Sequence, residues 1–196
     1  MNINEPPLSR HCDPLTELEK LKAVCLGCTR CDLRKGCNRV VFGDGIYSAR
    51  LMLVGEGPGA DEDKAGIPFV GRAGQLLDRI LEAAGIDRKA IYITNIVKCR
   101  PPGNRLPLQP EVDSCLPYLK KQLELIKPEI LVCLGGLATK TLIDKNAVVT
   151  RTRGKWHDID GRRVIATFHP AALLRDPSKK KDVWEDFKQI MKLYNT

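Results

Sequence analysis

The eight cysteines are the side chains of this 196-residue chain best suited to metal or redox chemistry. Six of them form two groups far apart in the sequence: Cys25, Cys28, Cys31 and Cys37, followed much later by Cys99 and Cys115. Thiolates from two distant segments can converge on zinc or on an iron–sulfur cluster, and the first group alone could form a local zinc site. The spacing leaves an iron–sulfur cluster, zinc and no metal as open alternatives. Cys133 lies in an apolar run and is expected to be buried, while Cys12 has no assigned role.

A glycine-rich turn with the sequence GEGPG occupies residues 55–59, directly after the apolar run at 51–54. It lacks the Gly-Lys-Ser/Thr ending of a phosphate loop and the third glycine of a dinucleotide loop, and Glu56 would repel a phosphate. Glycines let backbone N–H groups approach a ligand closely, and Phe69 supplies a ring for stacking. We expect one side of a pocket for something flat and neutral, such as a base. A plain surface turn is the alternative.

Apolar runs and amphipathic patterns predict the elements that position these residues. Strands are expected at residues 50–55, 90–98 and 128–136, and two more within 154–170, joined at the Asp160-Gly161 dipeptide. Helices are expected at residues 13–25, 72–85, 110–127, 137–143 and 181–194. This alternation predicts an α/β fold: a single domain over residues 13–196, three-layer α/β/α around a central, mostly parallel four-stranded sheet, after a flexible arm over residues 1–12.

Three of the distinctive segments fall at predicted strand ends: residues 55–59, 95–99 and 168–170. In parallel α/β sheets, ligands bind outside the carboxyl ends of the strands. The net charge of +8 permits a polyanionic partner there, although charge alone does not require one. The chain shows no signal-peptide pattern and no apolar run long enough to span a membrane, so we expect a cytoplasmic protein.

Taken in order, these motifs resemble one family, the family 4 uracil-DNA glycosylases, the iron–sulfur type of bacteria and archaea. The family's Gly-Glu-Ala/Gly-Pro-Gly motif stands at residues 55–59 and continues through residue 77; "TNIVKCRPP" stands at 94–102, and His-Pro-Ala-x-Leu-Leu-Arg at 169–175. The match runs from about Cys28 to the C-terminal helix. Glu56 argues against family 5, which has an apolar residue there, and the Lys-Arg-Arg-Ile-His insertion of the covalent-trapping relatives is missing.

The resemblance implies a monofunctional glycosylase of base excision repair. It would flip uracil out of single- or double-stranded DNA and hydrolyse the N-glycosidic bond, leaving an abasic site. It would act as a monomer, with contact to a sliding clamp left open. The implied ligands of a mainly structural 4Fe-4S cluster are Cys28, Cys31, Cys99 and Cys115. An iron–sulfur electron-transfer protein and a non-catalytic, metal-stabilised DNA-binding module are the competing interpretations.

Four residues are expected to bind uracil: Gly57, Glu62, Phe69 and Asn95. The amide of Asn95 would donate to O4 and accept from N3–H, and cytosine reverses both groups. Phe69 would stack on the ring, and by resemblance Glu62 would lie near C5 and exclude the thymine methyl group.

Two residues are implied to be catalytic. His169 would donate to uracil O2 as charge develops, beside the N–H of Gly57. Glu56 would either orient water or stabilise the sugar cation. At the DNA surface, the candidates are Leu173 and Leu174 as the wedge and Arg175 for phosphates.

Overall fold

Within residues 14–196, the part of the chain that the computed structural model describes, six strands form one sheet in the order β1-β3-β2-β4-β6-β5. The strands are β1 (Asp44–Gly45), β2 (Leu51–Gly55), β3 (Tyr92–Asn95), β4 (Ile130–Leu134), β5 (Trp156–Ile159) and β6 (Arg162–Thr167). The four central strands are parallel, as predicted, and the edge strands β1 and β5 are antiparallel to their neighbours. The sheet is therefore wider than the predicted four strands. β5, expected as one strand of the hairpin, extends it at one edge, and β1 at the other edge has only two residues, too few for a sequence pattern to reveal.

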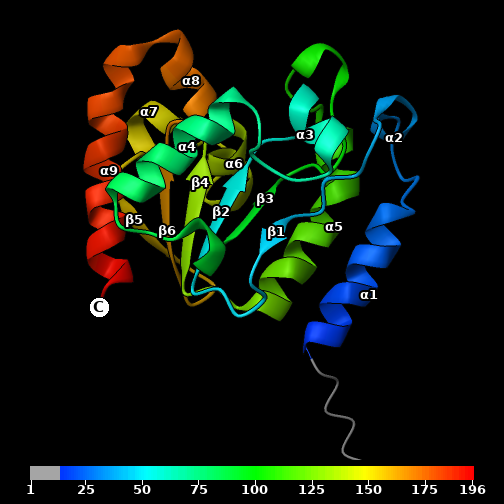
Figure 1. The fold of residues 1–196 in the computed structure, drawn as a ribbon, viewed down its shortest axis with the longest axis horizontal. Helices are drawn as coiled ribbons and strands as arrows, with labels where there is room; N and C mark the ends of the chain where they lie inside the picture. The colour runs from blue at the N-terminus through cyan, green and yellow to red at the C-terminus, as the bar shows by residue number, and fades with distance from the viewer. Residues whose placement is uncertain (1–13) are drawn as a thin grey trace, which may run out of the picture.

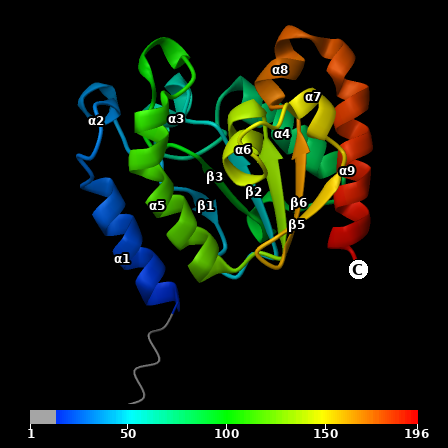
Figure 2. The same ribbon diagram turned by 180° about the vertical axis from the view of Figure 1, so that it is seen from behind.

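Helices cover both faces of the sheet and give the three predicted layers. Figure 1 shows α4 (Arg72–Ala83) in front of the strands, with α9 (Lys180–Tyr194) at the same side of the core. Figure 2 shows α5 (Gln109–Ile126) and α6 (Gly136–Leu142) over the opposite face, with α1 (Pro14–Leu26) beyond α5. Short helices complete the fold: α2 (Leu33–Gly36), α3 (Ala60–Ala65), α7 (Val149–Thr152) and α8 (Pro170–Arg175). Single 3-10 turns lie at Arg88–Ala90, Pro102–Asn104 and Pro177–Lys179.

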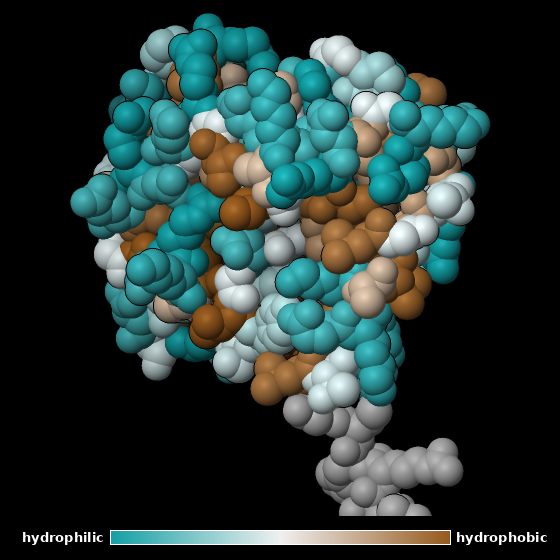
Figure 3. All heavy atoms as spheres, turned by 45° about the vertical axis from the view of Figure 1, so that its right-hand side comes forward, coloured by the Kyte–Doolittle hydropathy of each residue, from teal (hydrophilic) through white to brown (hydrophobic). Residues whose placement is uncertain are grey.

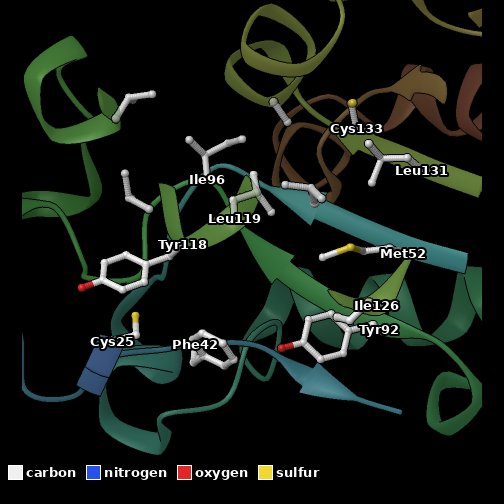
Figure 4. Close-up of a cluster of buried hydrophobic side chains, with 14 of the residues drawn as sticks. Cys25, Phe42, Met52, Tyr92, Ile96, Tyr118, Leu119, Ile126, Leu131 and Cys133 are labelled. Atoms are coloured by element: carbon white, nitrogen blue, oxygen red, sulfur yellow. The ribbon is translucent and has the colours of Figure 1, made fainter. Parts of the chain in front are cut away.

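The side chains of β2 alternate between two apolar clusters, one on each face of the sheet. Leu51 and Leu53 pack with α4 and α9, whereas Met52 and Val54 pack with α1 and α5. Figure 4 shows Met52 among the side chains of the second cluster. A strand buried on both faces is typical of a parallel sheet covered by helices, and it holds the turn that follows β2 on a rigid base.

The hairpin at the sheet edge has the predicted turn. Asp160 and Gly161 both have left-handed backbones, with φ of 50° and 74°, the requirement of a two-residue hairpin loop. None of the helices within residues 14–196 is long and apolar enough to cross a membrane. The predicted arm over residues 1–12 lies outside the described residues. The face in Figure 3 is mostly hydrophilic, with apolar side chains in several separate groups.

Candidate active site

An open cleft of about 740 Å³ lies at the carboxyl ends of the parallel strands. Strand register places the end of β2 beside that of β3, and the end of β4 beside that of β6. Residues at or just beyond these four ends line the cleft: Glu56, Asn95, Gly135 and His169. The other walls include residues of the 101–107 loop and of α8. The fold thus brings the three predicted strand-end segments to one site.

Asn95 places an unsatisfied acceptor in the wall of this cleft. Its side chain is 1% exposed, and its Oδ1 has no hydrogen-bond partner among the described residues. A Cβ on the facing Gly55 would lie 2.4 Å from this oxygen and 2.7 Å from the Phe69 ring, so only glycine fits there. A Cβ on Gly57 would similarly meet Val97 at 2.8 Å. Because buried polar atoms almost always have partners, this free oxygen marks a place for a ligand's N–H group.

Phe69 is held beside His169 by its own loop. The two ring centroids are 5.4 Å apart and the ring planes differ by 28°. Phe69 has an unusual left-handed φ of 54°. Arg88 holds this turn, since its guanidinium donates to the Phe69 carbonyl oxygen at 3.1 Å and to the Pro68 carbonyl oxygen at 2.7 Å. A Cβ on Gly74 would lie 1.9 Å from that Phe69 oxygen. The backbone that carries the ring is therefore fixed by the Arg88 guanidinium and by close packing against Gly74.

Glu62 lines the cleft, but its carboxylate is engaged by the backbone of its own loop. Oε2 accepts from the N–H of Gly59 at 3.0 Å, and Oε1 accepts from those of Val70 and Gly71 at 3.0 and 2.9 Å. This carboxylate ties the start of α3 to the turn after Phe69. Glu62 therefore shapes the pocket, and its predicted contact with uracil C5 stays a prediction.

The carboxylate of Glu56 is hydrogen-bonded to the backbone at the start of α6. Its Oε1 accepts from the Leu137 N–H at 3.0 Å. Burial raises the pKa of Glu56, while the N–H groups of Leu137 and Gly136 and the charge of Arg175 oppose that rise. A Cβ on Gly135, whose φ is 98°, would lie 2.5 Å from Glu56 Oε1 and 3.1 Å from His169 Cβ. The absence of a side chain at Gly135 lets the two predicted catalytic groups approach each other.

The imidazole of His169 has a defined tautomer. Its Nδ1 accepts from the backbone N–H of Ala171 at 3.1 Å, as the N-cap of α8. Burial, with a contribution from the charge of Arg175, lowers the pKa of His169 to about 4. The ring is therefore neutral at pH 7, and its single proton is on Nε2, which can donate.

The two predicted wedge leucines differ in exposure. Leu173 is 1% exposed and packs in the apolar cluster on the α4 and α9 side, whereas Leu174 is 39% exposed. Burial corrects the expectation for Leu173, because a side chain in the core cannot enter DNA. Arg175 is exposed and lines the cleft.

Five cysteines from both predicted groups line one small cavity beside the core: Cys25, Cys28, Cys31, Cys99 and Cys115. Backbone N–H groups donate to two of the sulfurs, from Arg30 to Cys28 Sγ at 3.5 Å and from Lys98 to Cys115 Sγ at 3.3 Å. The four implied ligands are all in this lining, so the donor type and the shared cavity fit a thiolate-held cluster. No three His, Cys, Asp or Glu side chains between residues 14 and 196 are themselves arranged to hold a metal ion.

The remaining cysteines have distinct surroundings. Cys25 is 1% exposed, at the edge of the cluster in Figure 4, and burial raises its pKa to about 12. Cys37 lies beside Cys99 and accepts from Arg34 Nη1 at 3.7 Å. Cys133 is fully buried in β4, which confirms the expectation. Cys12 lies outside the described residues.

Sequence analysis missed three residues that position the site: Arg88, Gly135 and Lys98. Gly135 could have been found, because it lies at the carboxyl end of the strand predicted at residues 128–136 and so belongs to the same sheet edge. Nothing in the local pattern of Arg88 indicates that it donates to the carbonyl oxygens of Pro68 and Phe69. Likewise, nothing near Lys98 indicates that its Nζ donates to the backbone carbonyl oxygen of Asn95.

Comparison with known proteins agrees with the resemblance found in the sequence. Residues 42–188 match the family model of the uracil DNA glycosylase superfamily. The chain is 42% identical to the type-4 uracil-DNA glycosylase of Sulfurisphaera tokodaii over 188 residues, covering 91% of this chain and 86% of that protein. It is 45% identical to that of Thermotoga maritima, covering 83% and 86%. A type-5 uracil-DNA glycosylase of Pyrobaculum aerophilum is 34% identical, covering 66% and 64%.

The residues that the family model matches include those that line the cleft at all four strand ends. The chain therefore belongs to the uracil-DNA glycosylase superfamily and, within it, to the type-4 uracil-DNA glycosylases.

Proposed function

We propose that this cleft receives a uracil flipped out of DNA and that the enzyme hydrolyses its N-glycosidic bond, releasing uracil and leaving an abasic site. Family membership supports the reaction class. The observation that carries the assignment to this cleft is the buried, unpartnered Oδ1 of Asn95. It matches the N3–H of uracil, a donor that cytosine lacks.

Recognition is proposed to depend on Asn95 and Phe69. The amide accepts from N3–H and donates to O4, while the phenyl ring stacks on the base. Discrimination against cytosine follows because cytosine would face the Asn95 carbonyl oxygen with an acceptor and the NH2 with a donor. Leaving these buried groups unpaired costs about 1–3 kcal/mol each.

The leaving group is proposed to be stabilised by His169. Bond cleavage places negative charge on the departing uracil, and a neutral imidazole that donates from Nε2 stabilises that charge as it forms. The Gly57 N–H is the second donor in this proposal. Because burial lowers the pKa of His169 to about 4, the ring is neutral at pH 7 before the step, and in this proposal it stabilises the leaving group as a hydrogen-bond donor.

Glu56 is proposed to carry the negative charge that faces the sugar. The sugar develops oxocarbenium character in glycoside hydrolysis, and an ionised carboxylate both stabilises that cation and orients attacking water. The hydrogen bond from Leu137 holds this carboxylate in place.

DNA contact is proposed for the rim formed by α8. Leu174 is exposed there and is the proposed wedge, while Arg175 meets phosphates. The net charge of +8 favours this partner.

The thiols of Cys28, Cys31, Cys99 and Cys115 are proposed to hold a 4Fe-4S cluster. When bound, the cluster supplies a covalent cross-link between the segment after α1, which carries Cys28 and Cys31, and the segment of Cys99 and Cys115, which runs from the loop after β3 into α5. Its role in this proposal is structural, because hydrolysis transfers no electrons.

The test of the function is strand scission after treatment of a uracil-containing oligonucleotide with enzyme and then alkali. We expect scission at uracil, in EDTA as well as without it, since no metal acts at the scissile bond in this mechanism. An intact strand, or activity that requires added Mg²⁺, would contradict the proposal.

A further inference from the structure

Lys98 is a fully buried lysine between the uracil cleft and the cysteine cavity. Its side chain is 1% exposed, and it follows Asn95 by three residues and precedes Cys99 directly. Its backbone N–H donates to Cys115 Sγ at 3.3 Å, while its side-chain Nζ donates to the backbone carbonyl oxygen of Asn95 at 2.8 Å. One residue therefore contacts both sites.

The hydrogen bonds of Lys98 require a charged ammonium. Nζ faces three oxygens: Thr94 Oγ1, the Asn95 carbonyl and Gln122 Oε1, the last at 2.7 Å. The Thr94 hydroxyl donates to the Phe42 carbonyl oxygen at 2.8 Å, so towards Lys98 it can only accept. A neutral amine has two N–H groups, whereas an ammonium has three.

The orientation of Gln122 is fixed by its own partners. Its Nε2 donates to the Phe42 carbonyl oxygen at 2.9 Å and to the Tyr92 hydroxyl at 3.0 Å, which leaves Oε1 for Lys98. All three oxygens around Nζ are thus acceptors.

No carboxylate of residues 14–196 forms an ion pair with Lys98. Buried carboxylates have other partners: Glu111 pairs with Arg105, and Asp186 pairs with Arg153. Lys98 lines the same cavity as Cys99 and Cys115, so a cluster held there by thiolates would supply a compensating negative charge. An isolated buried charge is strongly unfavourable, so a compensating charge is needed.

We propose that Lys98 is a positioning residue that joins the two sites: its ammonium balances the negative charge of the thiolate-held cluster, and its hydrogen bond to the backbone carbonyl of Asn95 fixes the residue whose side chain reads uracil. The first half rests on the cluster assigned under the proposed function. Lys98 also donates to the side chains of Thr94 and Gln122, so its ammonium connects β3 to α5.

The test replaces Lys98 by methionine, which is similar in length and uncharged. Gln122→Leu is the matched control, because it removes a polar partner of the same group and keeps the charge. Iron content, the reduction potential of the cluster and single-turnover uracil excision are measured for wild type and both variants. A nearby cation favours the reduced, more negative cluster, so we expect Lys98→Met to lower the potential and Gln122→Leu to leave it in place.

Excision by Lys98→Met should fall about 10- to 100-fold, the effect of a small misplacement of a recognition group. An unchanged potential, an unchanged excision rate, or an equal potential shift in Gln122→Leu would each overturn the proposal. Wild-type protein without iron would instead contradict the cluster, and wild-type protein without excision would contradict the proposed function.

A measurement on the wild-type protein covers the case in which Lys98→Met does not fold. Lysine ¹⁵N NMR at neutral pH distinguishes the Nζ of an ammonium from that of an amine. We expect one buried ammonium that is absent from a Lys98→Arg sample, and a neutral Lys98 amine would overturn the proposal.

Discussion

The backbone N–H of Ala171 donates to Nδ1 of His169 at 3.1 Å and thereby decides which ring nitrogen can serve the reaction. Because Nδ1 is an acceptor, the proton of the neutral ring is on Nε2. The same contact caps α8, so the helix that carries the proposed DNA-binding residues starts at the group proposed to stabilise the leaving uracil.

Replacing His169 by alanine should lower the single-turnover excision rate about 100- to 1,000-fold, the typical effect of losing one such donor. Binding of uracil-DNA should change little, because the hydrogen bond strengthens only as charge develops. His157→Ala is the control, since His157 lies on edge strand β5 outside the cleft. A His169→Ala enzyme with wild-type rate would remove this residue from the mechanism.

The pH dependence of the excision rate should distinguish the role of Glu56 from that of His169. Burial raises the pKa of Glu56 above its ordinary value, whereas the pKa of His169 is lowered to about 4. As pH falls from 7, Glu56 is protonated first and loses its charge, so the rate should decline before His169 titrates. Glu56→Gln should be slower by about 100-fold or more and lack this decline. Persistence of the same acidic decline in Glu56→Gln would assign it to another group.

Gly135→Ala should impair catalysis severely. The added Cβ would lie 2.5 Å from Glu56 Oε1 and 3.1 Å from His169 Cβ, in a backbone with φ of 98°. A displacement of either group by about 1 Å costs about 100-fold in rate. At the neighbouring Gly136, an added Cβ meets nothing within 4 Å, so Gly136→Ala should lower the excision rate far less than Gly135→Ala does. Equal rates for the two variants in single-turnover assays would contradict this account of the glycine.

The sequence predicts a site residue well when its position follows from its own strand or helix, and poorly when its position depends on contacts with distant residues. Asn95 and His169 could be placed together because parallel strands bring their carboxyl ends to one edge. The sequence could not show which of Leu173 and Leu174 is buried, because the buried face of a six-residue helix is decided by the elements that pack against it. Glu62 was placed in the pocket, but the direction of its carboxylate depends on the N–H groups of Val70 and Gly71, which a motif does not reveal.

The sheet also has parts that local sequence predicts and parts that depend on distant contacts. The four parallel strands and the Asp160-Gly161 turn follow from apolar runs and turn chemistry, whereas β1 forms only because Asp44 and Gly45 lie beside β3. Lys98 is the clearest case, because nothing local predicts that a lysine is buried among three oxygens that come from β3 and α5.

Removal of single cysteines should identify the cluster ligands. Alanine at Cys28, Cys31, Cys99 or Cys115 should each lower iron content and thermal stability together, because each thiolate anchors one of the two linked segments. Cys133→Ala is the control, since this cysteine is buried in β4 away from the cysteine cavity. Full iron content in both Cys99→Ala and Cys115→Ala, with loss in Cys25→Ala, would assign the ligands to the N-terminal group instead.

Single-turnover excision by Asn95→Asp, on matched oligonucleotides that carry uracil or cytosine, tests the central claim most directly. An aspartate carboxylate cannot donate to O4, so the uracil rate should fall about 10- to 100-fold. The ratio of the uracil rate to the cytosine rate should fall with it. Asn146→Asp makes the same chemical change at an exposed position outside the cleft and should keep the wild-type rate and ratio. A wild-type uracil rate and selectivity in Asn95→Asp would contradict the uracil pocket described here.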